Sequence, residues 1–204
     1  MYTGKPRVRI ADVHFRRLAC FLLGAWLAGG LFMDMVATQN FRSVDRLLDK
    51  PVAQASDQLE RMRPDGARML LRHQVSEQNR WYFQMWGLVE TGIGLALLLV
   101  LLFGSTERNF TLLLALLMLL IAIVKRFALT PQMVVLGRLI DWIPPGEPSA
   151  DRSHFRMAHN AFVGLDLLTW AIGFFLTARL LFRRQRRTGD PDEEALERRS
   201  RVGN

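Results

Sequence analysis

Cysteine is nearly absent from this chain of 204 residues, which contains only Cys20. A single thiol excludes a disulfide within the chain, a four-cysteine zinc site and an iron–sulfur cluster held by this chain alone. The common nucleotide-binding and hydrolase motifs G-x-x-x-x-G-K-[ST], G-x-G-x-x-G, G-x-S-x-G and H-E-x-x-H are missing as well. We therefore expect neither an enzyme activity nor a cofactor.

Long apolar runs are what the sequence has in abundance, since 50% of its residues are hydrophobic. A bilayer core about 30 Å thick is crossed by roughly 20 apolar residues in a helix. The third run is uncharged only as far as Val124, so its helix has to continue through Lys125 and Arg126 to cross the membrane. The sequence predicts an all-α bundle of four transmembrane helices, formed as one domain by residues 1–182. The expected spans are residues 18–36, 81–103, 110–136 and 157–182.

The polar segments between and after the spans differ in character. Residues 38–80 are charged but have helix-like apolar spacing, so we expect amphipathic helices in this first long loop. Residues 183–204 form a basic and then acidic tail, which we expect to be disordered. Its first arginines directly follow the last span, where they anchor the topology and contact anionic lipid. These arginines are Arg183, Arg184, Arg186 and Arg187.

Basic residues near the span ends favour one orientation in the membrane. The numbers of Lys and Arg on the two sides are equal, but Arg16 and Arg17 directly precede the first span and the tail arginines follow the last. This placement favours two cytoplasmic termini in a bacterial inner membrane. The first run is too long for a signal peptide and lacks its cleavage site. Besides the lipid bilayer, we expect a second copy or another membrane protein as a partner, and no nucleic acid.

Ionisable residues within the spans are the main functional signal, because they are costly to keep in a bilayer. Counting along the helices at about 1.5 Å per residue places Glu90 and Asp166 at one depth. Four more polar residues fall in the same half of the membrane, toward the long loops. His159 and Asp166 also share a helix face, because they are seven residues apart. The predicted polar cluster consists of Asp34, Glu90, Lys125, Arg126, His159 and Asp166.

Three interpretations of this cluster stay open. In the first, it binds or moves a small solute or ion, with a proton relay through its carboxylates as one form. In the second, its acids and bases pair internally and hold together a structural or partner-binding scaffold, whose working surface is residues 38–80. In the third, the protein is a metal- or haem-binding redox protein with His159, Met33 and Met35 as ligands. A haem between two histidines lacks a second histidine within the spans.

Three short motifs carry a likeness to a known group of membrane proteins. They are W-L-A-G-G-L-F at Trp26–Phe32, L-T-P-Q-M at Leu129–Met133 and F-R-M-A-H-N-A-F-V-G-L-D-L-L at Phe155–Leu168. On these motifs the chain resembles the bacterial domain-of-unknown-function family 4149, which is distantly similar to copper-resistance D-like membrane domains. The resemblance implies four spans and makes His159 the histidine of an H-x-x-S-M-L-L-N-L-L-like segment, in which Phe162 and Asp166 replace Ser and Asn. It implies no settled activity.

Overall fold

The computed structural model describes residues 10–51, 56, 64–104, 109–143 and 147–182. All regular secondary structure in these residues is helical, and four helical stretches are long and apolar enough to cross a membrane. The third crossing is not one regular helix, because a short π-helix divides it into two α-helical parts. The elements are α1 (Ile10–Asp49), α3 (Pro64–Gly104), α4 (Asn109–Val124), the π-helix η1 (Lys125–Leu129), α5 (Thr130–Ile140) and α6 (Ala150–Phe182).

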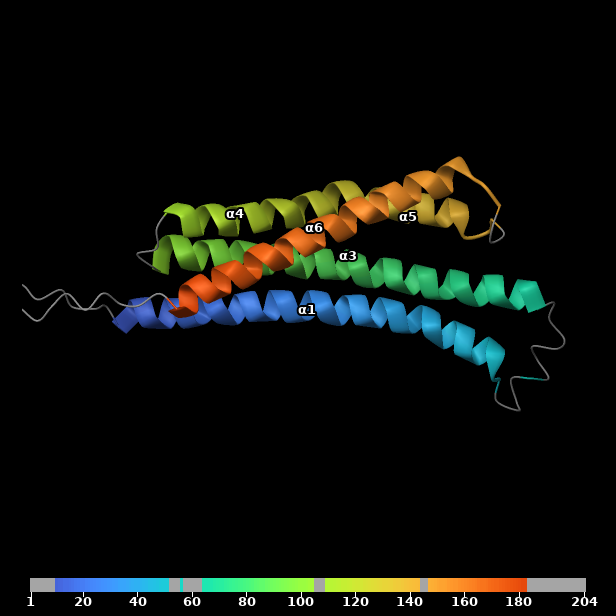
Figure 1. The fold of residues 1–204 in the computed structure, drawn as a ribbon, viewed down its shortest axis with the longest axis horizontal. Coiled ribbons are helices and arrows are strands. Elements are labelled where there is room, and N and C mark those ends of the chain that lie inside the picture. The colour runs from blue at the N-terminus through green and yellow to red at the C-terminus, as the bar shows by residue number, and fades with distance from the viewer. Residues whose placement is uncertain (1–9, 52–55, 57–63, 105–108, 144–146, 183–204) are drawn as a thin grey trace, which may run out of the picture.

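The helices cross one another within a long, narrow bundle (Figure 1). Helices α1 and α3 lie side by side along most of their length, and α4 packs against α3. Helix α6 begins beside α5 and runs obliquely across the bundle to the first half of α1. Four crossings bring Ile10 and Phe182 to the same end, whereas the cavity described below lies toward the opposite end.

Helices α1 and α3 extend well beyond the predicted spans. They contain 40 and 41 residues, which corresponds to about 60 Å and is twice the bilayer core. The helices predicted in residues 38–80 are therefore present as extensions of α1, up to Asp49, and of α3, from Pro64. The physical reason is that extending an existing helix avoids the cost of nucleating a new one. Helix α1 ends at Asp49, just before Pro51, whose ring disfavours helical backbone at the residue before it.

Contacts between the polar extensions keep α1 and α3 together outside the apolar spans. Asn40 Nδ2 donates a hydrogen bond to Asn79 Oδ1 at 2.7 Å, and Asn79 Nδ2 donates to a backbone carbonyl of α1. Val44 and Ala67 are buried between the two helices. The extensions are thus a packed helix pair, and their apolar spacing serves this mutual contact.

Residues buried inside the bundle recur at alternating intervals of three and four, which is the spacing of one helix face. This inner face carries small residues as well as large ones, so the helices approach closely. It also carries Glu90 and Lys125, which places two charged groups on faces that meet. Within residues 81–104 of α3 the buried residues are Gly87, Glu90, Gly94, Leu97 and Leu101, and along α4 and η1 they include Thr111, Ala115, Met118, Ala122 and Lys125.

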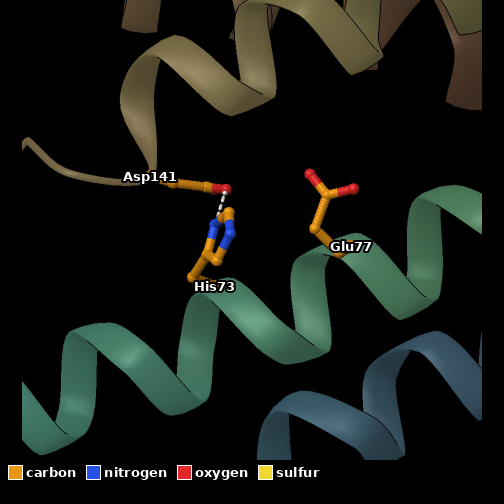
Figure 2. Close-up of side chains that lie close together, drawn as sticks. All are labelled: His73, Glu77 and Asp141. Carbon is orange, nitrogen blue, oxygen red and sulfur yellow. Dashed lines mark hydrogen bonds and ion pairs between the residues drawn. The ribbon is translucent and has the colours of Figure 1, made fainter.

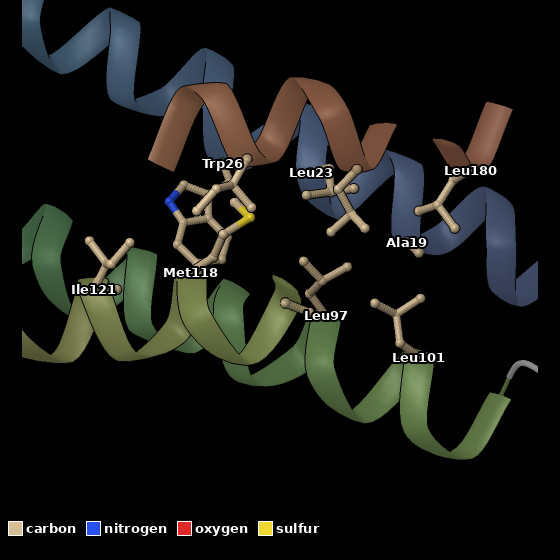
Figure 3. Packing of buried hydrophobic residues seen from close by; sticks show 12 residues of the cluster. Ala19, Leu23, Trp26, Leu97, Leu101, Met118, Ile121 and Leu180 are labelled. Atoms are coloured by element: carbon tan, nitrogen blue, oxygen red, sulfur yellow. The ribbon is translucent and has the colours of Figure 1, made fainter. Parts of the chain in front are cut away.

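An apolar core fills the end of the bundle where α1 begins and α6 ends. Figure 3 shows side chains of four helices converging there, and the indole of Trp26 lies at one edge of the group. Besides Trp26, the labelled residues are Ala19 and Leu23 of α1, Leu97 and Leu101 of α3, Met118 and Ile121 of α4, and Leu180 of α6. Glu90 and Lys125 lie beyond this core, so the interior of the bundle is apolar toward one end and polar toward the other, which we call the polar end.

The outer surface of the bundle is apolar. Large side chains such as Phe103 and Phe182 are 79% and 81% exposed, and many leucines of all four crossings are also exposed. A soluble monomer rarely exposes apolar patches of this size, whereas a bilayer solvates them. The chain is therefore an integral membrane protein.

The π-helix η1 lets the third crossing continue through Lys125 and Arg126, as the sequence predicts. Pro131 lies in the first turn of α5, and in a regular α-helix its ring would collide with the carbonyl of Phe127 four residues earlier. The wider π turn relieves this collision. The carbonyl of Lys125 accepts the hydrogen bond of the π turn from the backbone N–H of Thr130, five residues later, and a second one from Thr130 Oγ1 at 2.8 Å.

Gly94 allows α3 to approach α1, and this contact supports a first prediction. A Cβ atom at Gly94 would lie 2.9 Å from Cη2 of Trp26, whereas a Cβ at Gly92 would have nothing within 4 Å. We expect Gly94→Ala to lower the free energy of unfolding by about 1–3 kcal/mol, because the rigid indole has to move. Gly92→Ala is the matched control and should be neutral or slightly stabilising, since alanine favours helix.

The measurement is unfolding of both purified variants in mixed detergent–SDS micelles, followed by circular dichroism. Equal stability of the two variants would show that Gly94 does not limit the approach of α1 to α3.

Candidate functional site

A buried ionic cluster lies where α3, η1 and α6 meet. Lys125 Nζ donates to Oε1 and Oε2 of Glu90 at 2.8 and 3.0 Å, and it also contacts Asp166 Oδ1. The side chains of Lys125 and Glu90 are each 3% exposed, and that of Asp166 is 23% exposed. Three of the six residues predicted from the sequence therefore form one cluster, which we call the Lys125 cluster.

Helix geometry explains how these three residues meet. Glu90 and Lys125 occupy the inner faces of α3 and of the third crossing, which pack against each other. Asp166 reaches them because α6 crosses the bundle obliquely. The sequence predicts one depth for Glu90 and Asp166, and both contact the same ammonium group.

Trp26 is a fourth member of the cluster that the sequence analysis did not single out. Its Nε1–H donates a hydrogen bond to Oε1 of Glu90 at 2.9 Å, and its side chain is 2% exposed. Ala19, Leu23 and Trp26 follow the four-then-three spacing of one buried face, so a signal for its inward position was present. The spacing does not reveal the hydrogen-bond partner of the indole, because Glu90 lies 64 residues farther along the chain.

The charges of the Lys125 cluster do not balance, because one ammonium group serves two carboxyl groups. Inside a bilayer an unpaired charge is expensive, so such a group needs an opposite charge, hydrogen bonds or a proton. The Glu90 carboxylate accepts hydrogen bonds from Lys125 and Trp26, whereas Asp166 shares the Lys125 ammonium group with Glu90. The ring of Phe162 adds a further contact, with its centroid 4.9 Å from Lys125 Nζ.

A cavity of about 560 Å³ adjoins the cluster and includes Asp166 in its wall. It lies among α1, α3, α5 and α6, and its wall is mainly apolar and aromatic. Asp34 and His159, two further residues of the predicted site, also line it. His159 stacks on Phe155 with ring centroids 6.1 Å apart. The predicted cluster is thus divided into a buried part around Lys125 and a cavity part, joined through Asp166.

Arg126 points elsewhere. Consecutive helical residues are turned by roughly 100°, so it does not follow Lys125 into the cluster. Its aliphatic chain packs against Gly87, its guanidinium lies 5.5 Å from the ring centroid of exposed Phe127, and the described residues contain no ion pair with it. The prediction placed Arg126 in the polar cluster, and the structure places it outside.

The methionines proposed as metal ligands do not converge. Met33 is half-buried beside Asp34 and Trp86, whereas Met35 is exposed on the outer surface. Residues two positions apart on a helix point in widely different directions, which explains the separation. The arginines predicted to bind anionic lipid, residues 183, 184, 186 and 187, lie outside the described residues.

A second ionic network lies at the polar end of the bundle and was also missed by the sequence analysis. Arg80 of α3 donates two hydrogen bonds to Asp141, at 2.8 and 2.9 Å, and one to Glu77 at 2.6 Å. Arg138 of α5 binds both oxygens of Glu77, and His73 Nδ1 lies 2.8 Å from Asp141 Oδ2. The network joins α3 to the end of α5 across 61 residues of sequence.

Three members of this network have the arrangement of metal ligands. One ligand atom each of His73, Glu77 and Asp141 lies within 4.8 Å of the others, and Figure 2 shows the three side chains around one space. The guanidinium groups of Arg80 and Arg138, however, already bind both carboxylates. Their positive charges oppose a metal cation at this place. We interpret the group as an ionic link between helices.

The fold and the site together define a class: an integral membrane protein built as a four-helix bundle, with a buried ionic cluster beside a cavity. No family model, no curated protein and no solved structure matches this chain. The resemblance to domain-of-unknown-function family 4149 therefore stays a prediction.

Proposed function

We propose that this integral membrane protein binds a small solute in the cavity beside Asp166 and moves it across the bilayer. The observation that carries the proposal is that Asp166 belongs both to the buried Lys125 cluster and to the cavity wall. A solute in the cavity therefore contacts Asp166 and changes its ion pair with Lys125. Because that ion pair joins two helices, solute binding is coupled to helix packing. The cavity has the volume typical of small-molecule sites.

A structural scaffold is the competing function. It is supported by the pairing of Lys125 with Glu90 and Asp166, which holds three helices together without any ligand. A scaffold gives no reason, however, for an aromatic cavity that reaches this cluster. A metal or haem redox protein is less well supported, since His159 stacks on Phe155 and Met35 faces outward.

The proposal includes a location and an orientation. We place the chain in a bacterial inner membrane with both termini in the cytoplasm. Support comes from Arg16 and Arg17, which lie near the end of the bundle where Ile10 and Phe182 are found. Anionic lipid at the arginines that follow the last span, and a second copy of the chain, are the proposed partners.

Cysteine labelling tests whether the cavity is open to water. A thiol reacts as its thiolate, which forms in water but not in lipid. In a Cys20→Ala background, Leu167→Cys places a thiol in the cavity wall, and Leu168→Cys places one at the next residue, outside that wall. Both leucines are exposed, at 61% and 45%, so the comparison depends on the cavity and not on exposure alone. We expect a water-soluble methanethiosulfonate to modify Leu167→Cys rapidly and Leu168→Cys slowly.

Movement of a solute adds a second expectation. A transporter exposes its site to the two sides of the membrane in turn. Leu167→Cys should therefore react in right-side-out and in inside-out vesicles. Slow labelling of both cysteines, or reaction from one side only, would contradict transport, and slow labelling of both would favour the scaffold.

A further inference from the structure

The charges and rings of the cavity wall identify the class of its solute. We infer that the cavity binds an organic cation, namely a quaternary or protonated amine that carries an apolar or aromatic group. This inference rests on the proposed function and goes beyond it, because it names the charge and shape of the ligand.

The first argument is the excess of carboxyl groups over free cations. Asp34 and Asp166 both line the cavity. Lys125 is the cation of the adjoining cluster, and Glu90 already takes two of its contacts. Arg80 also lines the cavity, but its guanidinium is bound by Asp141 and Glu77. His159 is the remaining basic side chain of the described wall, and its ring stacks on Phe155. The carboxyl groups therefore outnumber the cations available to them, and a cationic solute supplies positive charge.

Asp34 is the clearest sign of this shortage. It lies on α1 within the span predicted for residues 18–36, and its charged or ionisable neighbours are Lys125, Glu90 and His159. Among the described residues, none forms an ion pair within 4.0 Å or a hydrogen bond with its side chain. It faces both the large cavity and a narrow gap that leads toward Trp86 and Asp166. A carboxylate in this position is stabilised by a cation that enters the cavity.

The second argument is the aromatic wall. Rings are attracted to cations through their quadrupole, most strongly where water is excluded. One ring of this cavity already makes such a contact, because Lys125 Nζ lies 4.9 Å from the centroid of Phe162. The aromatic residues of the wall, apart from His159, are Phe41, Phe83, Phe155, Phe162 and Trp170.

Other solute classes fit less well. A bare metal ion prefers a tight shell of oxygen or nitrogen ligands, whereas this cavity is wide and mainly apolar. An anion would meet Asp34 and Asp166 and be repelled. A neutral solute would fill the space but leave the carboxyl groups without a counter-charge.

The experiment compares three small benzyl compounds of different charge by isothermal titration calorimetry. The full chain is held in lipid nanodiscs, and the ligands are benzyltrimethylammonium, benzyl alcohol and benzenesulfonate. We expect the cation to bind and the neutral and anionic compounds to bind much more weakly. Asp34→Asn should weaken binding of the cation by about tenfold or more, because a charge contact in a partly desolvated site is lost.

Asp34 is the better residue to change because it leaves the Lys125 cluster intact. The matched control is Asp45→Asn, also on α1, which removes the same charge outside the cavity, where Asp45 pairs with Arg68 and Arg72 at 3.7 and 3.8 Å. Its affinity for the cation should equal that of the unaltered protein.

The outcomes separate the two proposals. If Leu167→Cys is labelled but the cation fails to bind, or binds no better than benzyl alcohol, the cation class is wrong and the solute cavity stands. Equal effects of Asp34→Asn and Asp45→Asn on the affinity for the cation would likewise show that the cation class is wrong. If neither cysteine is labelled, the proposed function fails, and the cation inference fails with it.

Discussion

Replacing Lys125 by methionine is expected to lower the free energy of unfolding by about 3–5 kcal/mol, the range for removing one partner of a buried ion pair. Methionine keeps most of the volume, so the loss is mainly electrostatic. Glu90 retains the hydrogen bond from Trp26, but the carboxylates of Glu90 and Asp166 then lose the one ammonium group that both contact in the described part of the chain. The cost is that of two uncompensated acids inside the membrane.

Two further variants make this test specific. Arg126→Met removes a positive charge from the next residue and should have a much smaller effect, because Arg126 packs outside the cluster. Adding Glu90→Gln to Lys125→Met should restore part of the stability, since the double variant buries one acid fewer. Unfolding in mixed micelles measures all three. Equal losses for Lys125→Met and Arg126→Met would contradict the assigned role of the cluster.

Replacing Trp26 by alanine should also cost about 3–5 kcal/mol, the range for truncating a large buried aromatic residue. The side chain packs within the apolar core (Figure 3) and also contacts Glu90 of the Lys125 cluster. Its removal leaves a void beside Gly94 and Leu119 and deletes a hydrogen bond to Glu90. In lipid, such lost packing contacts are a main source of destabilisation.

A more conservative change separates the two contributions of Trp26. Trp26→Phe keeps an aromatic ring and loses the N–H donor, so we expect a loss of about 1.5–3 kcal/mol from the hydrogen bond to the Glu90 carboxylate, with a smaller part from volume. Trp81→Ala is the control, because that side chain is exposed. The same unfolding assay applies. A loss for Trp81→Ala as large as for Trp26→Ala would show that burial of Trp26 is not the cause.

The number and approximate place of the crossings follow from the sequence, because bilayer thickness sets the length of an apolar helix. The third helix was predicted to continue through Lys125 and Arg126 because 15 uncharged residues are too few to cross a bilayer. The structure confirms this, since helix runs from Asn109 to Ile140 without a break. Helices are present in residues 38–80, as predicted, where the structure describes them, but the prediction did not include their continuity with α1 and α3. Apolar spacing identifies the apolar face of a helix. It does not indicate whether that face packs against another helix, as here, or lies on a membrane surface.

For the site, helical counting placed Glu90 and Asp166 at one depth, and seven-residue spacing placed His159 and Asp166 on one face. Both His159 and Asp166 line the cavity. Depth alone also placed Arg126 in the cluster, because depth along a helix says nothing about direction around it. Trp26 and the Arg80–Asp141 network were missed, as their contacts join residues 64 and 61 positions apart.

The sequence by itself determined the class of protein, the four crossings and the depth of the charged groups, because these depend on length and hydropathy along each helix. Only the tertiary structure decided which charges pair, because pairing depends on the rotation and crossing of helices that are distant in sequence. The contacts of Lys125 with Glu90 and Asp166 span 35 and 41 residues. The oblique path of α6 decides that Asp166 reaches both the ammonium group and the cavity.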